Sequence, residues 1–370
     1  MLISKKIRIK PTPEQEVQMR KTAGAARWAH NYVVATKQDN PSIKEGDLRK
    51  EVTKLKKTEG YSWLKEIGNE AIKQSIIDCF TSYRRLGRAK FHKKNESKPS
   101  FHLKHETLKR VDSHHVQCEK LGSVKTVEPF PKLPKGQRYY SKPTISYDNK
   151  YWYISVCIER EVTNTSIELS PIGIDLGVKD LAVVATSTSH LKTWKSINKT
   201  SRVKKLEKKL RRKQRKLSRQ CELKPFDKPL NNCKNYQKTQ KEVQHLYRRL
   251  ANIRENYLHQ VTTAIVKTKP SKIVLEDLDV SGMMKNQYLA KDIQDQCFYK
   301  FRTMIVYKAA LNSIPVQLAD RYYPSSKTCH NCGSKRPELS LSERTFVCYN
   351  CGYTEDRDVN AAMNLASLAN

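Results

Sequence analysis

Residues 171–185 read PIGIDLGVKDLAVVA, and this stretch decides how the second half of the chain folds. It contains two short apolar runs separated by a turn around Gly177, the pattern of two tightly joined strands. Both runs are almost continuously apolar, as expected of strands in a sheet covered on both faces. Asp175 interrupts the first run, and a carboxylate there is costly unless it is paired or binds a metal. The stretch therefore predicts a covered sheet that carries an acid at a position of functional interest.

Two further acids stand in comparable places downstream. Residues 272–278, KIVLEDL, predict another buried strand that ends in acids, with Glu276 the first of them. Residues 356–362, DRDVNAA, open the last predicted helix and contain Asp358. Three carboxylates that converge in space can hold two magnesium ions about 4 Å apart, an arrangement that hydrolyses phosphodiesters. Each acid taken alone could equally be a surface residue at the end of a strand. The prediction of a metal site depends on the three acids occurring together.

The motif GIDLG also has a different interpretation. A similar strand, turn and strand forms a phosphate loop in actin-like and sugar-kinase ATPases. The sequence contains no second glycine-rich phosphate loop and no Walker A motif to support nucleotide binding. The metal-binding interpretation of Asp175 is therefore preferred.

Four cysteines near the C-terminus have the spacing of a zinc site. Cys329, Cys332, Cys348 and Cys351 form the pattern C-x2-C-x15-C-x2-C, and a glycine follows each pair. Four thiolates complete a tetrahedral zinc shell with no open position, so we expect a structural zinc ribbon. Disulfides are the alternative, and they are rare in cytosolic proteins. The remaining cysteines show no ligand spacing and are expected to be ordinary core or surface residues: Cys79, Cys118, Cys157, Cys221, Cys233 and Cys297.

The charge balance points to nucleic acid. The 370 residues include 71 Lys or Arg and 37 Asp or Glu, which gives a formal net charge of +34. This excess argues against an ordinary enzyme of small neutral metabolites and is far above what solubility requires. The hydrophobic content of 38% is enough for a core, and the length suggests two or three domains. With neither a secretion signal nor an apolar run of membrane-spanning length, we expect a cytoplasmic, nucleoid-associated protein with no membrane partner, and a monomer is favoured.

A basic helical hairpin is predicted in the middle of the second half, over residues 199–266. Residues 199–219 contain twelve Lys or Arg and one acid, with apolar residues on a heptad-like seam. Residues 243–264 repeat apolar residues at three- and four-residue spacing, and a link over residues 221–240 joins the two helices. The hairpin is either a solvated coiled coil or a surface for a polyanion, and the repulsion among so many like charges favours the polyanion.

The N-terminal half combines helices with short strands. Residues 3–10 alternate apolar and basic residues and predict a strand, and residues 12–15, TPEQ, predict a capped helix start. A second helix is predicted over residues 63–86, followed by a basic stretch without regular structure whose aromatic residues can stack on bases. Short strands over residues 113–162 predict a small β domain. The first strand is expected to complete that domain, which makes the helices an insertion into it.

Several of these segments together resemble the TnpB family of transposon-encoded RNA-guided DNA nucleases, the small relatives of type V CRISPR effectors. The resemblance is most specific in the C-terminal half and extends over most of the chain. The segments that carry it are KIRIKPTPEQ (6–15), AARWAHNYV (25–33), SYDNKYWYISVCIE (146–159), GIDLGVKDLAV (173–183), IVLEDL (273–278), SKTCHNCG (326–333) and FVCYNCGYTEDRDVNAAMNLA (346–366).

The resemblance implies a multidomain α+β architecture. An RNase H-like (RuvC) α/β nuclease domain would be interrupted by the helical hairpin and a zinc ribbon, and preceded by a β-barrel wedge and a helical recognition lobe. The implied boundaries are 1–12 for the first wedge strand, 13–110 for the recognition lobe, 111–170 for the wedge, 171–325 for the nuclease domain with its hairpin at 199–266, 326–355 for the zinc ribbon and 356–370 for the C-terminal nuclease helix.

The resemblance also implies an activity and a set of site residues. Asp175, Glu276 and Asp358 would be the catalytic, magnesium-binding acids, and Asp358 is preferred over Asp356 because the family's acid stands two residues before the asparagine, here Asn360. The implied cofactors are two catalytic magnesium ions and one structural zinc. The implied partners are a guide RNA from the transposon end and a double-stranded DNA target with a short adjacent motif. An RNA-guided repressor without useful cleavage and a transposase of the same fold remain as alternatives.

Overall fold

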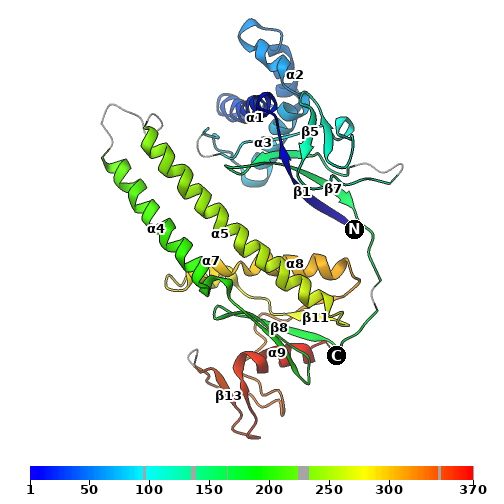
Figure 1. Ribbon diagram of the computed structural model, residues 1–370, viewed down its shortest axis with the longest axis vertical. Helices are drawn as coiled ribbons and strands as arrows, with labels where there is room; N and C mark the ends of the chain where they lie inside the picture. The colour runs from blue at the N-terminus through cyan, green and yellow to red at the C-terminus, as the bar shows by residue number, and fades with distance from the viewer. Residues whose placement is uncertain (95–96, 135–138, 165, 224–232, 341–342, 370) are drawn as a thin grey trace. The chain divides into compact units, whose positions relative to one another are not determined.

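The computed structural model describes residues 1–94, 97–134, 139–164, 166–223, 233–340 and 343–369. The chain divides into two compact units, Met1–Arg160 and Glu161–Asn370 (Figure 1). The boundary falls ten residues before the nuclease domain expected to begin at residue 171. The second unit contains the covered sheet, the helical hairpin and the cysteine-rich segment, so every predicted site residue lies in it.

The first unit is built on a seven-stranded sheet. Its strands are β1 (Leu2–Lys10), β2 (Ser100–His102), β3 (Lys109–Arg110), β4 (His115–Cys118), β5 (Gly122–Thr126), β6 (Thr144–Tyr147) and β7 (Trp152–Glu159). Their order in the sheet is β2-β6-β7-β1-β5-β4-β3, with β1 antiparallel to β7 over most of its length and to β5 at its end. The prediction that the first strand completes the later β domain is confirmed. Closure of this sheet into a barrel stays a prediction.

Helices lie between β1 and β2 in the chain, as expected of an insertion. They are α1 (Pro13–Asp39), α2 (Glu45–Leu55), the 3-10 helix η1 (Glu59–Glu66) and α3 (Asn69–Leu86), and a further 3-10 turn, η2, covers His105–Thr107. α1 begins with the predicted capping box, in which the Thr12 and Gln15 side chains each accept a hydrogen bond from the other's backbone N–H.

Three predictions for this half are wrong in detail. The helix predicted over residues 63–86 is two elements, because the chain becomes extended at Ile67 between η1 and α3. The helical range 13–110 extends too far, because β2 and β3 near its end belong to the sheet. β2 forms within the basic stretch predicted to lack regular structure, since Phe101 there is buried in the core opposite Ile145.

The second unit is built on a five-stranded sheet. Its strands are β8 (Ile172–Leu176), β9 (Asp180–Ala185), β10 (His190–Lys195), β11 (Ile273–Leu275) and β12 (Val316–Leu318), and a separate two-stranded ribbon is formed by β13 (Thr345–Val347) and β14 (Thr354–Asp356). The sheet order is β10-β9-β8-β11-β12. β9 is antiparallel to both β8 and β10, whereas β11 is parallel to both β8 and β12. The two strands predicted within residues 171–185, joined around Gly177, are confirmed.

Helices cover both faces of this sheet, as the apolar runs predicted. The helices of the unit are the 3-10 turn η3 (Ile197–Lys199), α4 (Ser201–Glu222), α5 (Lys234–Lys267), α6 (Val280–Met283), α7 (Ala290–Gln296), α8 (Phe298–Ala310) and α9 (Arg357–Ser367). Ile172 and Ile174 of β8 share one core with residues of α5 and α8, whereas Val274 of β11 packs with Leu365 of α9. Figure 1 shows α8 and α9 on opposite sides of the strands β8 and β11.

α4 and α5 form the predicted hairpin (Figure 1). Their contact is an apolar seam of Val203, Leu206 and Leu210 on α4 and Val243, Leu246 and Leu250 on α5. α5 begins at Lys234, so the predicted link over residues 221–240 is too long, and residues 224–232 of that link lie outside the described residues. In the part of the chain that is described, no helix combines the length and the apolarity that crossing a bilayer requires.

Candidate active site and zinc ribbon

The strands β8 and β11 place two of the three predicted acids side by side. The strands pair in parallel from Ile172↔Ile273 to Ile174↔Leu275, so Asp175 and Glu276 occupy the next matching positions. Neighbouring strands lie about 4.8 Å apart, which brings the two backbones within reach of a shared ion. The sequence predicted both acids at strand ends, and the parallel register explains why they meet.

Successive side chains of a strand point to opposite faces of the sheet, and this shows which helix Asp175 and Glu276 face. Val274 packs with Leu365 of α9, and Gly173 lies directly against the same helix. Asp175 and Glu276 each follow one of these residues by two positions, so their side chains point to the face that α9 covers. The third acid is on that helix, because Asp358 lies in the first turn of α9.

Gly173 permits the close approach of α9 to β8. A Cβ atom at this position would lie 2.0 Å from the carbonyl oxygen of Ala362 and 2.4 Å from the backbone nitrogen of Ala366. Both atoms belong to the helix backbone, which cannot move aside as a flexible side chain can. The absence of a side chain at Gly173 therefore fixes the position of the helix that begins with Asp358.

The start of α9 distinguishes the two candidates for the third acid. Asp356 is the N-cap residue, and its carboxylate accepts hydrogen bonds from the backbone N–H groups of Asp358 and Val359 at 2.9 and 3.2 Å. Asp358 instead contacts two guanidinium groups, with Arg357 at 3.2 Å and Arg344 at 3.9 Å. The carboxylate of Asp356 is used to cap the helix. This is consistent with the expectation that Asp358, rather than Asp356, is the metal-binding acid.

The electrostatics of the three acids favour a bound cation. Burial raises the pKa of Asp175 well above its ordinary value, and the negative charges of Glu276 and Asp358 raise it further. Burial also raises the pKa of Glu276. Carboxylates that oppose one another's ionisation are stabilised by a positive ion, and an all-oxygen set of ligands suits magnesium. The donor set therefore fits magnesium in its chemistry.

The carboxylate oxygens of the three acids are farther apart than the ligand atoms of one tightly bound ion. Across the described residues, the cysteines are the one group whose ligand atoms all lie within 4.8 Å of one another, so the three carboxylates are not that tightly clustered. A pair of ions about 4 Å apart spans a wider set of ligands than one ion does. The arrangement is compatible with the two-ion expectation.

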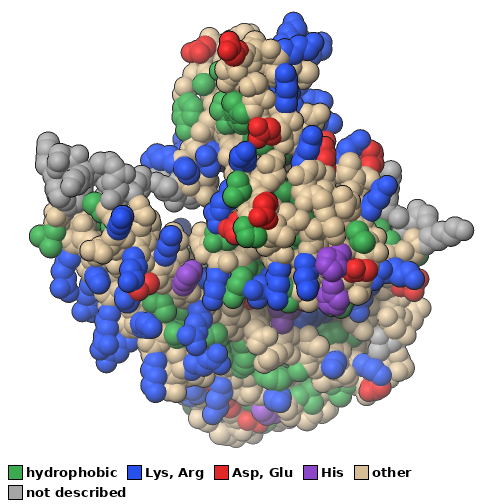
Figure 2. All heavy atoms as spheres, turned by 45° about the horizontal axis from the view of Figure 1, so that its top comes forward, with side chains coloured by type: hydrophobic (Ala, Val, Ile, Leu, Met, Phe, Trp, Pro, Cys, Tyr) green, Lys and Arg blue, Asp and Glu red, His purple; other side chains and the backbone are tan. Residues whose placement is uncertain are grey.

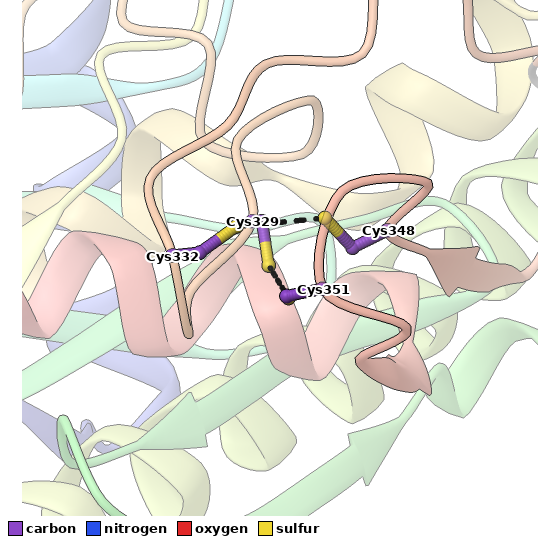
Figure 3. A group of neighbouring side chains, drawn as sticks. All are labelled: Cys329, Cys332, Cys348 and Cys351. Carbon is purple, nitrogen blue, oxygen red and sulfur yellow. Dashed lines mark hydrogen bonds between the residues drawn. The ribbon is translucent and has the colours of Figure 1, made fainter.

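The four cysteines of the ribbon do form a compact group. Figure 3 shows their side chains converging, and all four sulfur atoms lie within 4.8 Å of one another. The sulfurs of Cys329 and Cys351 are 3.6 Å apart, as are those of Cys332 and Cys348, and all four residues are free cysteines. A tetrahedral zinc ion with bonds of about 2.3 Å separates its sulfur ligands by about 3.8 Å. The group therefore fits structural zinc, as the spacing predicted.

Each CxxC pair is shaped by the glycine that follows it. Gly333 and Gly352 adopt φ angles of 72° and 71°, and their backbone N–H groups donate to the carbonyl oxygens of Cys329 and Cys348. Glycine reaches this left-handed conformation without the strain that a side chain would introduce. The tight turn brings both thiols of a pair to the same side, toward the other pair.

Two buried asparagines connect the ribbon to α9. Asn360 and Asn364 are 0% and 4% exposed, and each donates a hydrogen bond to the carbonyl oxygen of Thr328, at 2.8 and 2.7 Å. Asn360 also accepts a hydrogen bond from the backbone N–H of His330, inside the first cysteine pair. Hydrogen bonds therefore join the first cysteine pair to the helix that carries Asp358. Spacing alone could not reveal this contact.

We expect Cys348→Ser to abolish zinc binding and to loosen the start of α9, because the remaining three thiols leave the zinc shell incomplete. The measurement is zinc content of the purified protein by elemental analysis, together with proteolysis of the C-terminal segment. Cys157→Ser, on β7 of the first unit, is the matched control and should keep one zinc per chain. Unchanged zinc content in Cys348→Ser would refute the four-cysteine site.

A second charged cluster next to Glu276 had no signal in the sequence. Asp277 accepts hydrogen bonds from Arg302 at 2.7 Å and from Arg321 at 2.9 Å. Together with Glu276 and Tyr299, these residues line a surface cavity. The partners are 25 and 44 residues apart from Asp277 in the chain, so only the fold brings them together.

Comparisons with family models divide the chain into three matched regions. Residues 1–41 match a model described as a helix-turn-helix domain, residues 155–287 one described as a probable transposase, and residues 298–365 the Cas12f1-like TNB domain. In this structure the first region consists of strand β1 and the long helix α1 rather than two helices joined by a turn. The last region includes α8, the cysteine ribbon and most of α9.

Curated relatives match nearly the whole chain. A protein of Escherichia coli K12 named putative RNA-guided DNA endonuclease InsQ is 30% identical over 386 residues, covering 97% of this chain and 90% of the relative. A putative RNA-guided DNA endonuclease of Streptomyces pristinaespiralis is 27% identical over 377 residues, covering 97% and 87%. Among solved structures, a Cas12f1–sgRNA–target DNA complex aligns over 100% of both chains at 14% identity and a TM-score of 0.40.

Proposed function

Because this chain belongs to the TnpB family of transposon-encoded, RNA-guided DNA endonucleases, we propose that it cuts DNA at sites selected by a bound guide RNA. The observation that carries the proposal is the convergence of the acids. Asp175 and Glu276 stand at matching positions on adjacent parallel strands, and both face the helix that carries Asp358. A mixed sheet covered by helices on both faces supports the further proposal of an RNase H-like, RuvC-type nuclease domain.

We propose that the reaction depends on magnesium held by Asp175, Glu276 and Asp358. When bound there, magnesium would supply activation of water as the nucleophile and stabilisation of the leaving phosphodiester oxygen. The chain positions its ligands through the β8–β11 register and the close packing of α9. Arg357 and Arg344 contact Asp358 and limit the repulsion among the acids in the metal-free protein.

Sequence selection would come from base pairing with the guide rather than from the protein. A net charge of +34 suits a protein that binds nucleic-acid backbones over a large surface. The guide would come from the transposon end, and the target would carry a short adjacent motif. We propose that residues around 27–32 of the first unit read the motif. Here His30 stacks on His92 with ring centroids 3.7 Å apart, and the Asn31 side chain forms hydrogen bonds with the backbone N–H and carbonyl oxygen of His92.

The test is reconstitution with RNA. The protein is purified with co-expressed RNA from its own locus, that RNA is sequenced, and a DNA carrying the matching sequence is supplied with magnesium. We expect cleavage that requires the RNA, the match and magnesium, and a DNA with a scrambled match should stay intact. Tight target binding without cutting would instead identify a guided repressor, and strand-transfer products formed without RNA would identify a transposase.

A further inference from the structure

The cavity beside Glu276 differs in charge from the surface as a whole. The chain has 71 Lys or Arg against 37 Asp or Glu, and Figure 2 shows cations spread over the face in view. By contrast, the cavity is lined by three acids, Glu276, Asp277 and Asp279, and by two arginines. Even when a metal ion neutralises Glu276, the remaining charges only balance, so the cavity offers no net attraction to a phosphate. It suits an uncharged group.

The cavity has the size and the lining for a flat ring. Its volume is about 220 Å³, and a cavity of about 150 Å³ with an apolar lining is enough to bind benzene. Leu278, Val280 and Phe298 contribute apolar surface, and Tyr299 adds an aromatic ring. In a nucleic acid the flat, uncharged group is the base, so a single base is the occupant that this lining favours.

Tyr299 provides an accessible ring on which a base can stack. It is 68% exposed, whereas the neighbouring Phe298 is 3% exposed. The Arg302 guanidinium lies 5.6 Å from the centre of the Tyr299 ring, and Asp277 accepts a hydrogen bond from Arg302 at 2.7 Å. Asp277 directly follows Glu276 in the chain. These contacts therefore hold the exposed ring in place beside the proposed metal-binding acid.

We propose that this cavity binds one unpaired base of the strand being cut, next to the phosphodiester that reacts at Glu276, and that the base stacks on Tyr299. The inference rests on the proposed nuclease function, which places that phosphodiester at the three acids. A base inside a duplex is already stacked on its neighbours, so the cavity selects a single strand. Every base has an aromatic face, so the contact is independent of sequence.

The first test removes the base from the DNA. The RNA-bound protein cuts a matched target in magnesium, and the position of the cut is mapped. Two further targets then carry an abasic nucleotide immediately 5′ or immediately 3′ of that phosphodiester. Stacking of a base on an aromatic side chain contributes about fivefold to a hundredfold in affinity. We expect one of the two abasic targets to be cut more slowly than the intact target by a factor in this range, under single-turnover conditions.

The second test removes the ring from the protein. Tyr299→Ala should cut intact DNA more slowly by the same factor and should not distinguish it from the abasic target, because both changes delete one contact. Tyr299→Phe keeps the ring and should restore the distinction. The control is Tyr288→Ala, an exposed tyrosine that does not line the cavity, and it should keep the parent's ratio of the two rates. All three variants should keep their zinc and the melting temperature of the parent.

A third measurement does not depend on cleavage. The full-length, RNA-bound protein is irradiated without magnesium in the presence of single-stranded DNA that contains 5-iodouracil, and the cross-linked peptides are identified by mass spectrometry. We expect a cross-link at Tyr299 that disappears in Tyr299→Ala.

Three results would overturn the inference. They are equal cutting of the intact target and both abasic targets by the parent, a Tyr299→Ala protein that still distinguishes them, and cross-links that omit Tyr299. A parent protein that cuts no DNA would contradict the proposed nuclease function instead, and the cross-link would then decide whether the cavity binds a base.

Discussion

Asp175→Ala should eliminate guided DNA cleavage, lowering the rate by about 10³-fold or more. Asp175 stands on β8, the strand against which α9 packs, and beside Glu276, which directly follows β11. Its removal deletes a ligand of the proposed metal site and also removes a partly buried carboxylate that Glu276 and Asp358 repel, so the protein should fold and bind its RNA normally. The measurement is single-turnover cleavage by the RNA-bound protein in magnesium.

The control for this substitution is Asp292→Ala, an exposed acid on α7 of the same unit. It should cleave at the parent rate. Cleavage by Asp175→Ala within tenfold of the parent would defeat the assignment of the triad. Loss of RNA binding in Asp175→Ala would show instead that the residue supports the fold.

Gly173→Ala should lower stability more than any other glycine-to-alanine change in the second unit. The added carbon would lie 2.0 Å from the carbonyl oxygen of Ala362, so α9 must move away from β8. Overpacking of a well-filled core lowers the free energy of unfolding by about 1–3 kcal/mol. Because the added carbon meets the backbone of α9 rather than a flexible side chain, we expect a loss of about 3 kcal/mol. The displacement also moves Asp358, and a shift of about 1 Å in a catalytic group lowers a rate by about 10²-fold.

Denaturant unfolding and cleavage of the same preparation measure both effects. Gly46→Ala is the control, because a Cβ at this position in α2 meets nothing within 4 Å. Alanine there should leave stability unchanged or raise it slightly, through its better helix propensity. A Gly173→Ala protein with unchanged stability would show that α9 can shift without cost, and that its close packing does not fix Asp358.

Local patterns in the sequence were enough to predict the elements that form the site. The apolar runs predicted β8, β9 and β11, the three- and four-residue spacing predicted the hairpin, and the paired CxxC motifs predicted the cysteine cluster. Each of these signals depends on residues that are close together in the sequence, so it can be recognised without knowledge of the fold. The capping box at Thr12 was predictable for the same reason.

Long-range contacts account for what the sequence did not reveal. β2 forms because Phe101 fills the core opposite Ile145, and a three-residue strand leaves almost no pattern of its own. The connection of Asn360 and Asn364 to Thr328 joins a loop and a helix more than thirty residues apart. Residues of this kind look like ordinary polar surface positions until the fold shows them buried.

The proposed activity depends on Asp175, Glu276 and Asp358 binding divalent ions together. The most direct measurement is a structure of the RNA- and DNA-bound protein in manganese, with anomalous scattering used to locate the ions. We expect manganese density in contact with carboxylate oxygens of all three acids, separate from a zinc peak among the four cysteines. Manganese bound elsewhere on the second unit, with the three acids uncoordinated while the DNA strand is in place for cutting, would contradict it.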